Sequence, residues 1–156
     1  MCQLNMKKII LNENFENNDS LEKYIKVESL PNLCFKNCLF ENLFLPDYVF
    51  EKCLFQNCII NSIDLTRIFM NKCCFKNCTM SNSDFSFADI NKTTFKNCKL
   101  IKLNLIASDF ISCKFKKTYM FKNNLDNILI SDVKIYELNQ WVHIDNFSVL
   151  EKNFNE

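Results

Sequence analysis

The sequence contains no glycine and only two prolines among its 156 residues. Glycine is the residue that proteins normally use where the backbone must adopt a positive φ angle. A chain without glycine cannot form a glycine-rich phosphate-binding loop. Its tight turns must use other residues, chiefly asparagine. The missing glycine therefore excludes one large class of nucleotide-binding sites.

Histidine is almost as scarce, because His143 is the single one in the chain. No partner nucleophile can be recognised for it, so we expect a surface residue rather than a catalytic base. No set of residues with the spacing of metal ligands stands out either. We therefore expect no catalytic residues, no metal and no cofactor, and we predict that the protein is not an enzyme.

Long apolar segments are also missing. No apolar run approaches the about 20 residues of a transmembrane helix, and the N-terminus lacks the pattern of a signal peptide. The net charge is only +1, so the chain as a whole is neither strongly basic nor strongly acidic. We expect a soluble cytoplasmic protein with no membrane partner, in which the ten cysteines stay reduced.

What the sequence does have is a period of five. Every fifth residue from Leu30 to Ile135 is Phe, Leu, Ile or Met, without a slip in register. This period matches neither a helix nor a strand, so the chain must turn at every repeat. The side chain two residues before each large residue is often small. Seven of these positions are cysteines: Cys38, Cys53, Cys58, Cys73, Cys78, Cys98 and Cys113.

The repeats SDFSF (83–87), ADINK (88–92) and SDFIS (108–112) resemble the pentapeptide-repeat family. The resemblance implies an all-β fold, a right-handed quadrilateral parallel β-helix with four repeats per coil. The sequence itself is most alike at a spacing of 20 residues, as in LCFKN from 33 and CCFKN from 73. This spacing gives four repeats per coil independently, and about five coils in total.

The repeat divides the chain into three parts. Residues 1–27 are predicted to be an N-terminal cap, residues 28–135 the β-helix, and residues 136–156 a C-terminal helical cap. In the N-terminal cap, KKIIL predicts a short strand. Asp19 or Ser20 is expected to cap a helix that ends near Val27.

The C-terminal tail predicts helices from its apolar spacing. It is similar to the tail of the quinolone-resistance members of the family. That similarity implies an end-to-end homodimer, with contacts from Leu138, Trp141, Val142, Phe147 and Leu150.

The predicted core combines two columns of residues that recur every 20 positions. A large column contains Phe35, Phe55, Phe75, Phe95 and Phe115, and a small column contains Cys38, Cys58, Cys78 and Cys98. Buried cysteine acts as a small hydrophobic residue, and we favour this interpretation over disulfides or zinc. Cys34 and Cys74 are expected to point outward and, with Cys2, to be the reactive thiols. Asparagine also recurs every 20 residues, at Asn37, Asn57, Asn77 and Asn97. This column predicts type II turns at these positions, and we expect turns of other types on the other faces.

Lysine is the residue type with the most suggestive outward arrangement. Residues 33–135 carry 14 Lys and Arg against 9 Asp and Glu. A stripe of lysines attracts an anionic partner, although it also keeps a solvated rod soluble and unaggregated. The candidate partner-binding face contains Lys36, Lys52, Lys72, Lys76, Lys92, Lys96 and Lys116.

Together these features predict a non-enzymatic scaffold that binds a macromolecule along one face. The family resemblance implies a protein partner, a type II topoisomerase (DNA gyrase or topoisomerase IV), which such proteins protect from quinolones by mimicking DNA. The repeats do not show the net acidic charge that this mimicry uses. The alternative is an interaction module that binds an anionic partner through the lysines, and direct nucleic-acid binding stays open.

Overall fold

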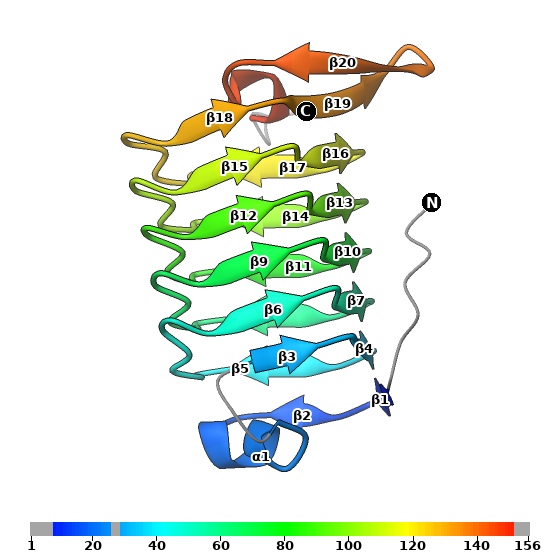
Figure 1. The fold of residues 1–156 in the computed structure, drawn as a ribbon, viewed down its shortest axis with the longest axis vertical. Coiled ribbons are helices and arrows are strands. Elements are labelled where there is room, and N and C mark those ends of the chain that lie inside the picture. The colour runs from blue at the N-terminus through cyan, green and yellow to red at the C-terminus, as the bar shows by residue number, and fades with distance from the viewer. Residues whose placement is uncertain (1–7, 26–28, 152–156) are drawn as a thin grey trace.

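The structure, a computed structural model, describes residues 8–25 and 29–151. The chain winds into a four-sided β-solenoid of about five turns, and strands of successive turns pair in parallel (Figure 1). The predicted all-β fold of stacked parallel coils is therefore confirmed. Three sides of the solenoid are sheets, and the fourth is a ladder of isolated bridges.

The largest sheet, which we call the lysine side, has eight strands. In spatial order they are β1 (Lys8–Leu11), β4 (Leu33–Lys36), β7 (Leu54–Gln56), β10 (Cys74–Lys76), β13 (Thr94–Lys96), β16 (Lys114–Lys116), β19 (Val133–Glu137) and β20 (Gln140–Ile144).

Two six-stranded sheets adjoin the lysine side. One contains β17 (Tyr119–Phe121), β14 (Lys99–Ile101), β11 (Thr79–Ser81), β8 (Ile59–Asn61), β5 (Leu39–Glu41) and β2 (Asn14–Phe15). The other contains β18 (Leu129–Ser131), β15 (Asp109–Ile111), β12 (Asp89–Asn91), β9 (Phe69–Asn71), β6 (Val49–Glu51) and β3 (Ser29–Pro31).

The fourth side, which we call the turn side, lies opposite the lysine side (Figure 1). Its ladder consists of single parallel bridges that join Phe44, Asp64, Asp84, Asn104 and Asn124 in that order. After each bridge the chain makes a hydrogen-bonded turn, as where Ile68 N donates to Leu65 O at 3.1 Å. Each turn leaves little extended backbone for pairing, which is why this side forms no continuous sheet.

The interior follows the five-residue period. Most strands have three residues and bury the middle one, because alternate side chains of a strand point to opposite faces. In the phenylalanine column, the ring centroids of Phe55, Phe75, Phe95 and Phe115 lie 4.7, 5.2 and 4.9 Å apart, and successive ring planes differ by 7° or 8°. The parallel register of the strands therefore stacks identical side chains directly above one another.

The corners explain how the chain turns without glycine. A positive φ angle occurs at every fifth residue from Asn32 to Asp132, on all four sides. The Asn37–Asn97 column has the expected positive φ angles. The other corners share this sign of φ, so lysine, serine and even Phe87 adopt a left-handed conformation.

The cost of a left-handed conformation without glycine is about 1–2 kcal/mol per residue. Hydrogen bonds along the ladder offset this cost. For example, the N–H of Lys72, itself at a corner, donates to the carbonyl of Asn91 in the next turn at 3.0 Å.

The N-terminal end is closed by α1 (Asn18–Glu22), which lies across the first turn (Figure 1). The predicted strand is present as β1, but Asn17 caps the helix, rather than Asp19 or Ser20, since its side chain accepts from Ser20 N at 3.0 Å. The helix ends at Glu22, and the expected end near Val27 lies outside the described residues.

The C-terminal end differs most from expectation, because the predicted helix from residue 136 is wrong. Strands β19 and β20 form an antiparallel hairpin instead. Leu138 and Asn139 both have positive φ angles, 45° and 65°, which suits a two-residue hairpin turn. Pairing of β19 with β16 extends the lysine side by further ladder bonds, and this pairing outweighs the helical spacing of the apolar residues. Among the described residues that follow, Ser148–Leu150 form a short 3-10 helix.

Candidate functional site

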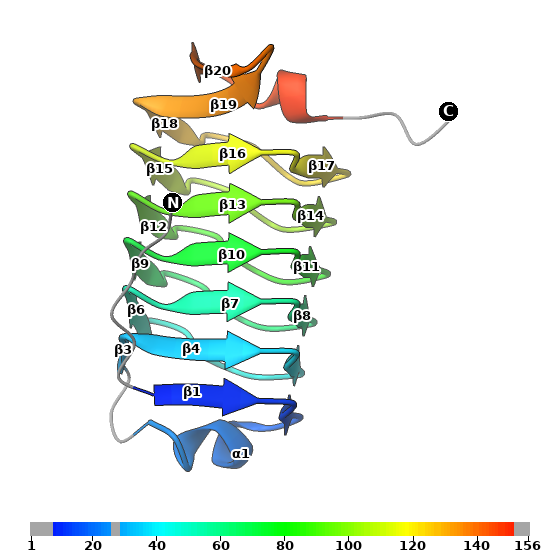
Figure 2. The ribbon, with the colours of Figure 1, turned by 90° about the vertical axis from the view of Figure 1, so that its right-hand side faces the viewer.

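The outer face of the lysine side carries a ladder of like charges. Lys76, Lys96 and Lys116 lie opposite one another on β10, β13 and β16, as can be followed in Figure 2, which looks onto this sheet. Like charges directly opposite each other on neighbouring strands destabilise a sheet. The described part of the chain shows no ion pair between any of these three lysines and an acidic side chain.

A groove of about 620 Å³ runs over this part of the sheet. Four of its lining residues are lysines, two are aromatic and none is acidic. The lining consists of Leu54, Gln56, Cys74, Lys76, Thr94, Lys96, Lys114, Lys116, Tyr136 and Trp141. The groove is therefore a positively charged channel with an aromatic end.

The aromatic end comes from the C-terminal hairpin. Tyr136 on β19 lies opposite Trp141 on β20, and their ring centroids are 5.2 Å apart in an edge-to-face arrangement. The ammonium group of Lys116 lies 3.6 Å from the Tyr136 ring centroid, and that of Lys114 lies 5.6 Å from the Trp141 ring centroid. The hairpin thus places flat aromatic rings beside the last two lysines of the groove.

The structure separates the seven lysines of the candidate partner-binding face into two groups. Lys76, Lys96 and Lys116 line the groove, and Lys36 lies further along the same column on β4. The other three occupy a corner with positive φ angles, outside the groove lining, at Lys52, Lys72 and Lys92. Lys52 also contacts Glu51, with Nζ and Oε1 3.4 Å apart.

Three charged or aromatic residues of the groove, Lys114, Tyr136 and Trp141, were not predicted as part of a binding face. Lys114 precedes Phe115 and Lys116 follows it, so alternation along the strand would have placed both lysines on the outer face. Tyr136 comes 20 residues after Lys116 and could have been found by the same period. Trp141 could not, because its position depends on the hairpin that the helical interpretation missed.

The nine described cysteines are buried. Cys58, Cys78 and Cys98 of the small column are buried, and their thiols point to carbonyl oxygens of the preceding coil, as from Cys78 Sγ to Phe55 O at 3.3 Å. The nine described cysteines are free thiols, and no group of residues suited to a metal ion is found in residues 8–25 and 29–151. Burial raises the pKa of Cys113 to about 12, which keeps that thiol protonated.

The expectation of reactive thiols at Cys34 and Cys74 is wrong, because their exposed fractions are only 1% and 5%. Both point outward from the sheet, but a small side chain there is shielded by its larger neighbours. Leu54 lies between the two on β7. Burial also raises the pKa of Cys34. Cys2 lies outside the described residues.

The turn side carries charge of the opposite sign. Asp64 and Asp84 each accept a hydrogen bond from a backbone N–H two residues on, Thr66 N at 2.9 Å and Ser86 N at 2.8 Å. These side chains therefore shape the turns. The acidic residues of the turn side and the adjoining β3–β18 sheet are Asp47, which is ion-paired with Arg67, and Asp64, Asp84, Asp126, Glu51, Asp89 and Asp109. The net positive charge of residues 33–135 gave no sign that positive and negative side chains lie on different sides of the solenoid.

The predicted dimer contacts are divided between the surface and the interior. Leu138, Trp141 and Val142 are exposed on the hairpin. Phe147 and Leu150 are buried, and the Phe147 ring packs against Phe110 at 4.9 Å and Phe115 at 5.3 Å between centroids. These two residues seal the last coil, so the expectation that they are dimer contacts is wrong.

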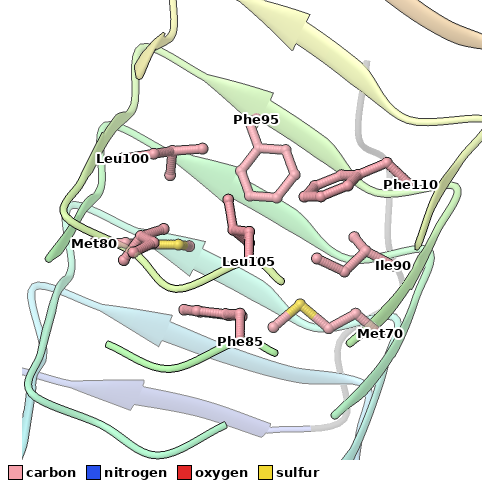
Figure 3. A pocket seen from close by; sticks show the side chains of 9 residues that line it. Met70, Met80, Phe85, Ile90, Phe95, Leu100, Leu105 and Phe110 are labelled. Carbon is pink, nitrogen blue, oxygen red and sulfur yellow. The ribbon is translucent and has the colours of Figure 1, made fainter. Parts of the chain in front are cut away.

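A void in the solenoid interior is too small for a substrate. The void has a volume of about 10 Å³ and is lined by apolar side chains such as Met70, Phe85 and Phe110 (Figure 3). A volume of this size admits at most one water molecule, and an apolar lining keeps it dry.

Within residues 8–25 and 29–151, no helix has the length and apolar character needed to span a membrane.

Comparison with known proteins matches the repeat. Residues 61–97 match the family model "Pentapeptide repeats", in eight copies. No curated protein sequence matches the chain.

Solved structures that match the chain include the following three. A trypsin-treated form of QnrB1, a plasmid-mediated fluoroquinolone resistance protein, is 13% identical, with coverage of 82% of this chain and 72% of that one and a TM-score of 0.44. The pentapeptide repeat protein Rfr23 from the cyanobacterium Cyanothece is 14% identical, with coverage of 84% and 82% and a TM-score of 0.29. HetL from the cyanobacterium Nostoc, involved in heterocyst differentiation regulation, is 5% identical, with coverage of 78% and 85% and a TM-score of 0.25.

The unbroken five-residue register and the stacked four-sided coils agree with the family match. Residues 61–97 of this chain are therefore pentapeptide repeats.

Proposed function

We propose that this protein is a non-enzymatic scaffold that holds an anionic macromolecule against the outer face of the lysine side. The observation that carries this proposal is the groove of about 620 Å³ lined by four lysines and no acidic residue. A reducing cytoplasm suits such a scaffold, because its nine described cysteines are free thiols.

The lysines that line the groove repel one another. The strands hold the backbones of Lys76, Lys96 and Lys116 in register, so only rotation of the side chains can separate their charges. An anion that lies along the groove reduces this repulsion and releases the counterions that the lysines attract. The fold thus presents a charge pattern that a polyanion stabilises.

Retention on heparin tests the proposal. Reversing two groove charges with Lys76→Glu and Lys96→Glu is expected to weaken heparin binding by roughly tenfold or more and to lower the salt concentration of elution. The matched control, Lys99→Glu with Lys102→Glu, changes the net charge equally outside the groove lining and is expected to elute close to the unmodified protein. Equal losses in both variants would show that only net charge matters and would contradict the proposal.

A second candidate function is favoured by the acidic residues of the turn side and its neighbouring sheet. Such a surface resembles the charge of DNA, and we propose a type II topoisomerase as the partner for it. Added protein would then relieve the inhibition of DNA gyrase supercoiling by ciprofloxacin. No relief at an excess of protein over gyrase would contradict this candidate and leave the lysine-side proposal intact.

A homodimer through the tail also remains a proposal. Its contacts would come from the exposed hairpin residues Leu138 and Val142. Light scattering of the unmodified protein and of Leu138→Asp tests the dimer by giving the molecular mass of each in solution. If both have the mass of a monomer, the dimer is contradicted.

A further inference from the structure

The aromatic end of the groove adds ring surfaces to the positive charge of the lysines. Trp141 is 41% exposed and lines the same groove as four lysines. Its opposite neighbour Tyr136 lies on the same face of the sheet, because directly paired residues of antiparallel strands share a face. A partially exposed indole in a cationic groove offers a ring surface as well as charge.

We propose that the groove binds single-stranded nucleic acid, with phosphates at the lysines and a base stacked against Trp141. This inference rests on the proposed function, since it names the anionic partner of the same site. Single strands combine regularly spaced negative charges with flat rings that are free to stack, and proteins that bind them pair basic grooves with aromatic side chains.

The contacts of the two aromatic rings support this partner. Lys116 and Lys114 already lie over the Tyr136 and Trp141 rings, at 3.6 and 5.6 Å from the centroids. A phosphate bound by either ammonium group would therefore place its nucleotide next to a ring. A sulfated polysaccharide or an acidic peptide would use the lysines and leave the tryptophan without a stacking partner.

The dimensions of the groove also fit a short single strand. From β7 to β20 the groove crosses six neighbouring strands, which corresponds to about 24 Å at the usual spacing between strands. This length accommodates a few nucleotides. Duplex DNA is a poorer fit, because its bases are stacked on one another and cannot reach Trp141.

Fluorescence anisotropy of a labelled oligothymidylate of about ten nucleotides provides the test. The unmodified protein is expected to bind it with a log–log salt slope of about −3, as for four phosphate contacts on a single strand. Trp141→Ala is expected to weaken this binding roughly 5- to 150-fold. Trp141→Phe, which keeps a ring, should recover most of the affinity.

Heparin, the matching duplex and an acidic peptide, each measured with the same variants, distinguish the outcomes. The inference predicts that Trp141→Ala leaves heparin binding unchanged, since heparin has no bases. Heparin binding without oligothymidylate binding would overturn the inference and leave the proposed function standing. Equal affinity for the duplex, tighter binding of the acidic peptide, or no effect of Trp141→Ala would also overturn it. Failure of every polyanion to bind would overturn both.

The variants must be shown to be folded. Trp141 lies at the outer edge of the terminal strand β20 and is partly exposed, so its replacement should leave the circular dichroism spectrum unchanged. Lys99→Glu serves as the charge control against Lys96→Glu. Both lysines are exposed, and they lie on the neighbouring strands β14 and β13 of different sides. Equal losses from these two changes would contradict a site confined to the groove.

Discussion

The lysine side and the turn side are built from the same five-residue repeat and differ in almost every outward property. Inward, Phe75 on the lysine side and Phe85 on the turn side are both buried. Outward, the lysine side presents Lys76 and Lys96, whereas the turn side presents Asp64 and Asp84. The inward residues determine the fold, and the outward residues are free to give each side its own charge.

The two sides also differ in their backbone. The lysine side is a continuous sheet that the hairpin extends to β20, while the turn side has single bridges followed by hydrogen-bonded turns. A flat, regular sheet holds side chains in register over several turns. That regularity makes the lysine side the better platform for an extended partner.

The largest expected effect concerns what the two sides share. Phe75→Ala and Phe85→Ala each remove a buried ring and should each lower the free energy of unfolding by about 3–5 kcal/mol. Urea denaturation measures both. A much smaller loss for Phe85→Ala would show that the turn side contributes less to the core than its burial indicates.

A smaller effect is expected at the corners. Phe87, after the turn side, has a φ angle of 59° and is 59% exposed, so Phe87→Asn should raise the free energy of unfolding by about 1 kcal/mol, because asparagine tolerates this conformation. Asn77 has a φ angle of 55° and donates from Nδ2 to Asn57 Oδ1 at 3.0 Å. Asn77→Ala should therefore destabilise by roughly 1–2 kcal/mol. Thermal melting of both variants measures whether the two changes in stability have opposite signs. A more stable Asn77→Ala would contradict the claim that asparagine favours the positive φ angle at the corners.

The smallest effect depends on pH and belongs to the turn side. Burial tends to raise the pKa of Asp84, but hydrogen bonds from Ser86 and Asn104 outweigh it and hold the pKa below its usual value. A carboxyl group with a lowered pKa in the folded state stabilises the protein above its unfolded pKa and loses this contribution as the pH falls. Between about pH 6 and pH 3, the unmodified protein should therefore lose slightly more stability than Asp84→Asn. An identical pH dependence of unfolding would contradict this role.

The sequence predicted the solenoid well because the period reports directly on the interior. Each inward residue from Leu30 to Ile135 repeats without insertion, so the stacking of the phenylalanine column followed from spacing alone. The corner conformations at Lys72 and Phe87 could not be predicted from residue preference, because the geometry of the coil overrides it. The tail was predicted incorrectly because the apolar spacing of Ile135, Leu138 and Val142 also fits a hairpin.

The candidate site was predicted only in part for the same reason. Lys76, Lys96 and Lys116 belong to the period and were identified. Trp141 belongs to the hairpin, which pairs with the sheet rather than continuing the repeat. The position of Trp141 depends on the pairing of β20 with β19, and no local pattern in the sequence predicts that pairing.

The most direct test of the central claim, that the lysine side binds the anionic partner, is a map of lysine protection. The protein is acetylated briefly with and without a saturating polyanion, and mass spectrometry gives the modification of each lysine. The account predicts that Lys76, Lys96, Lys114 and Lys116 become protected while Lys99 and Lys102 do not. Uniform protection of all lysines, or protection centred on Lys99 and Lys102, would contradict it.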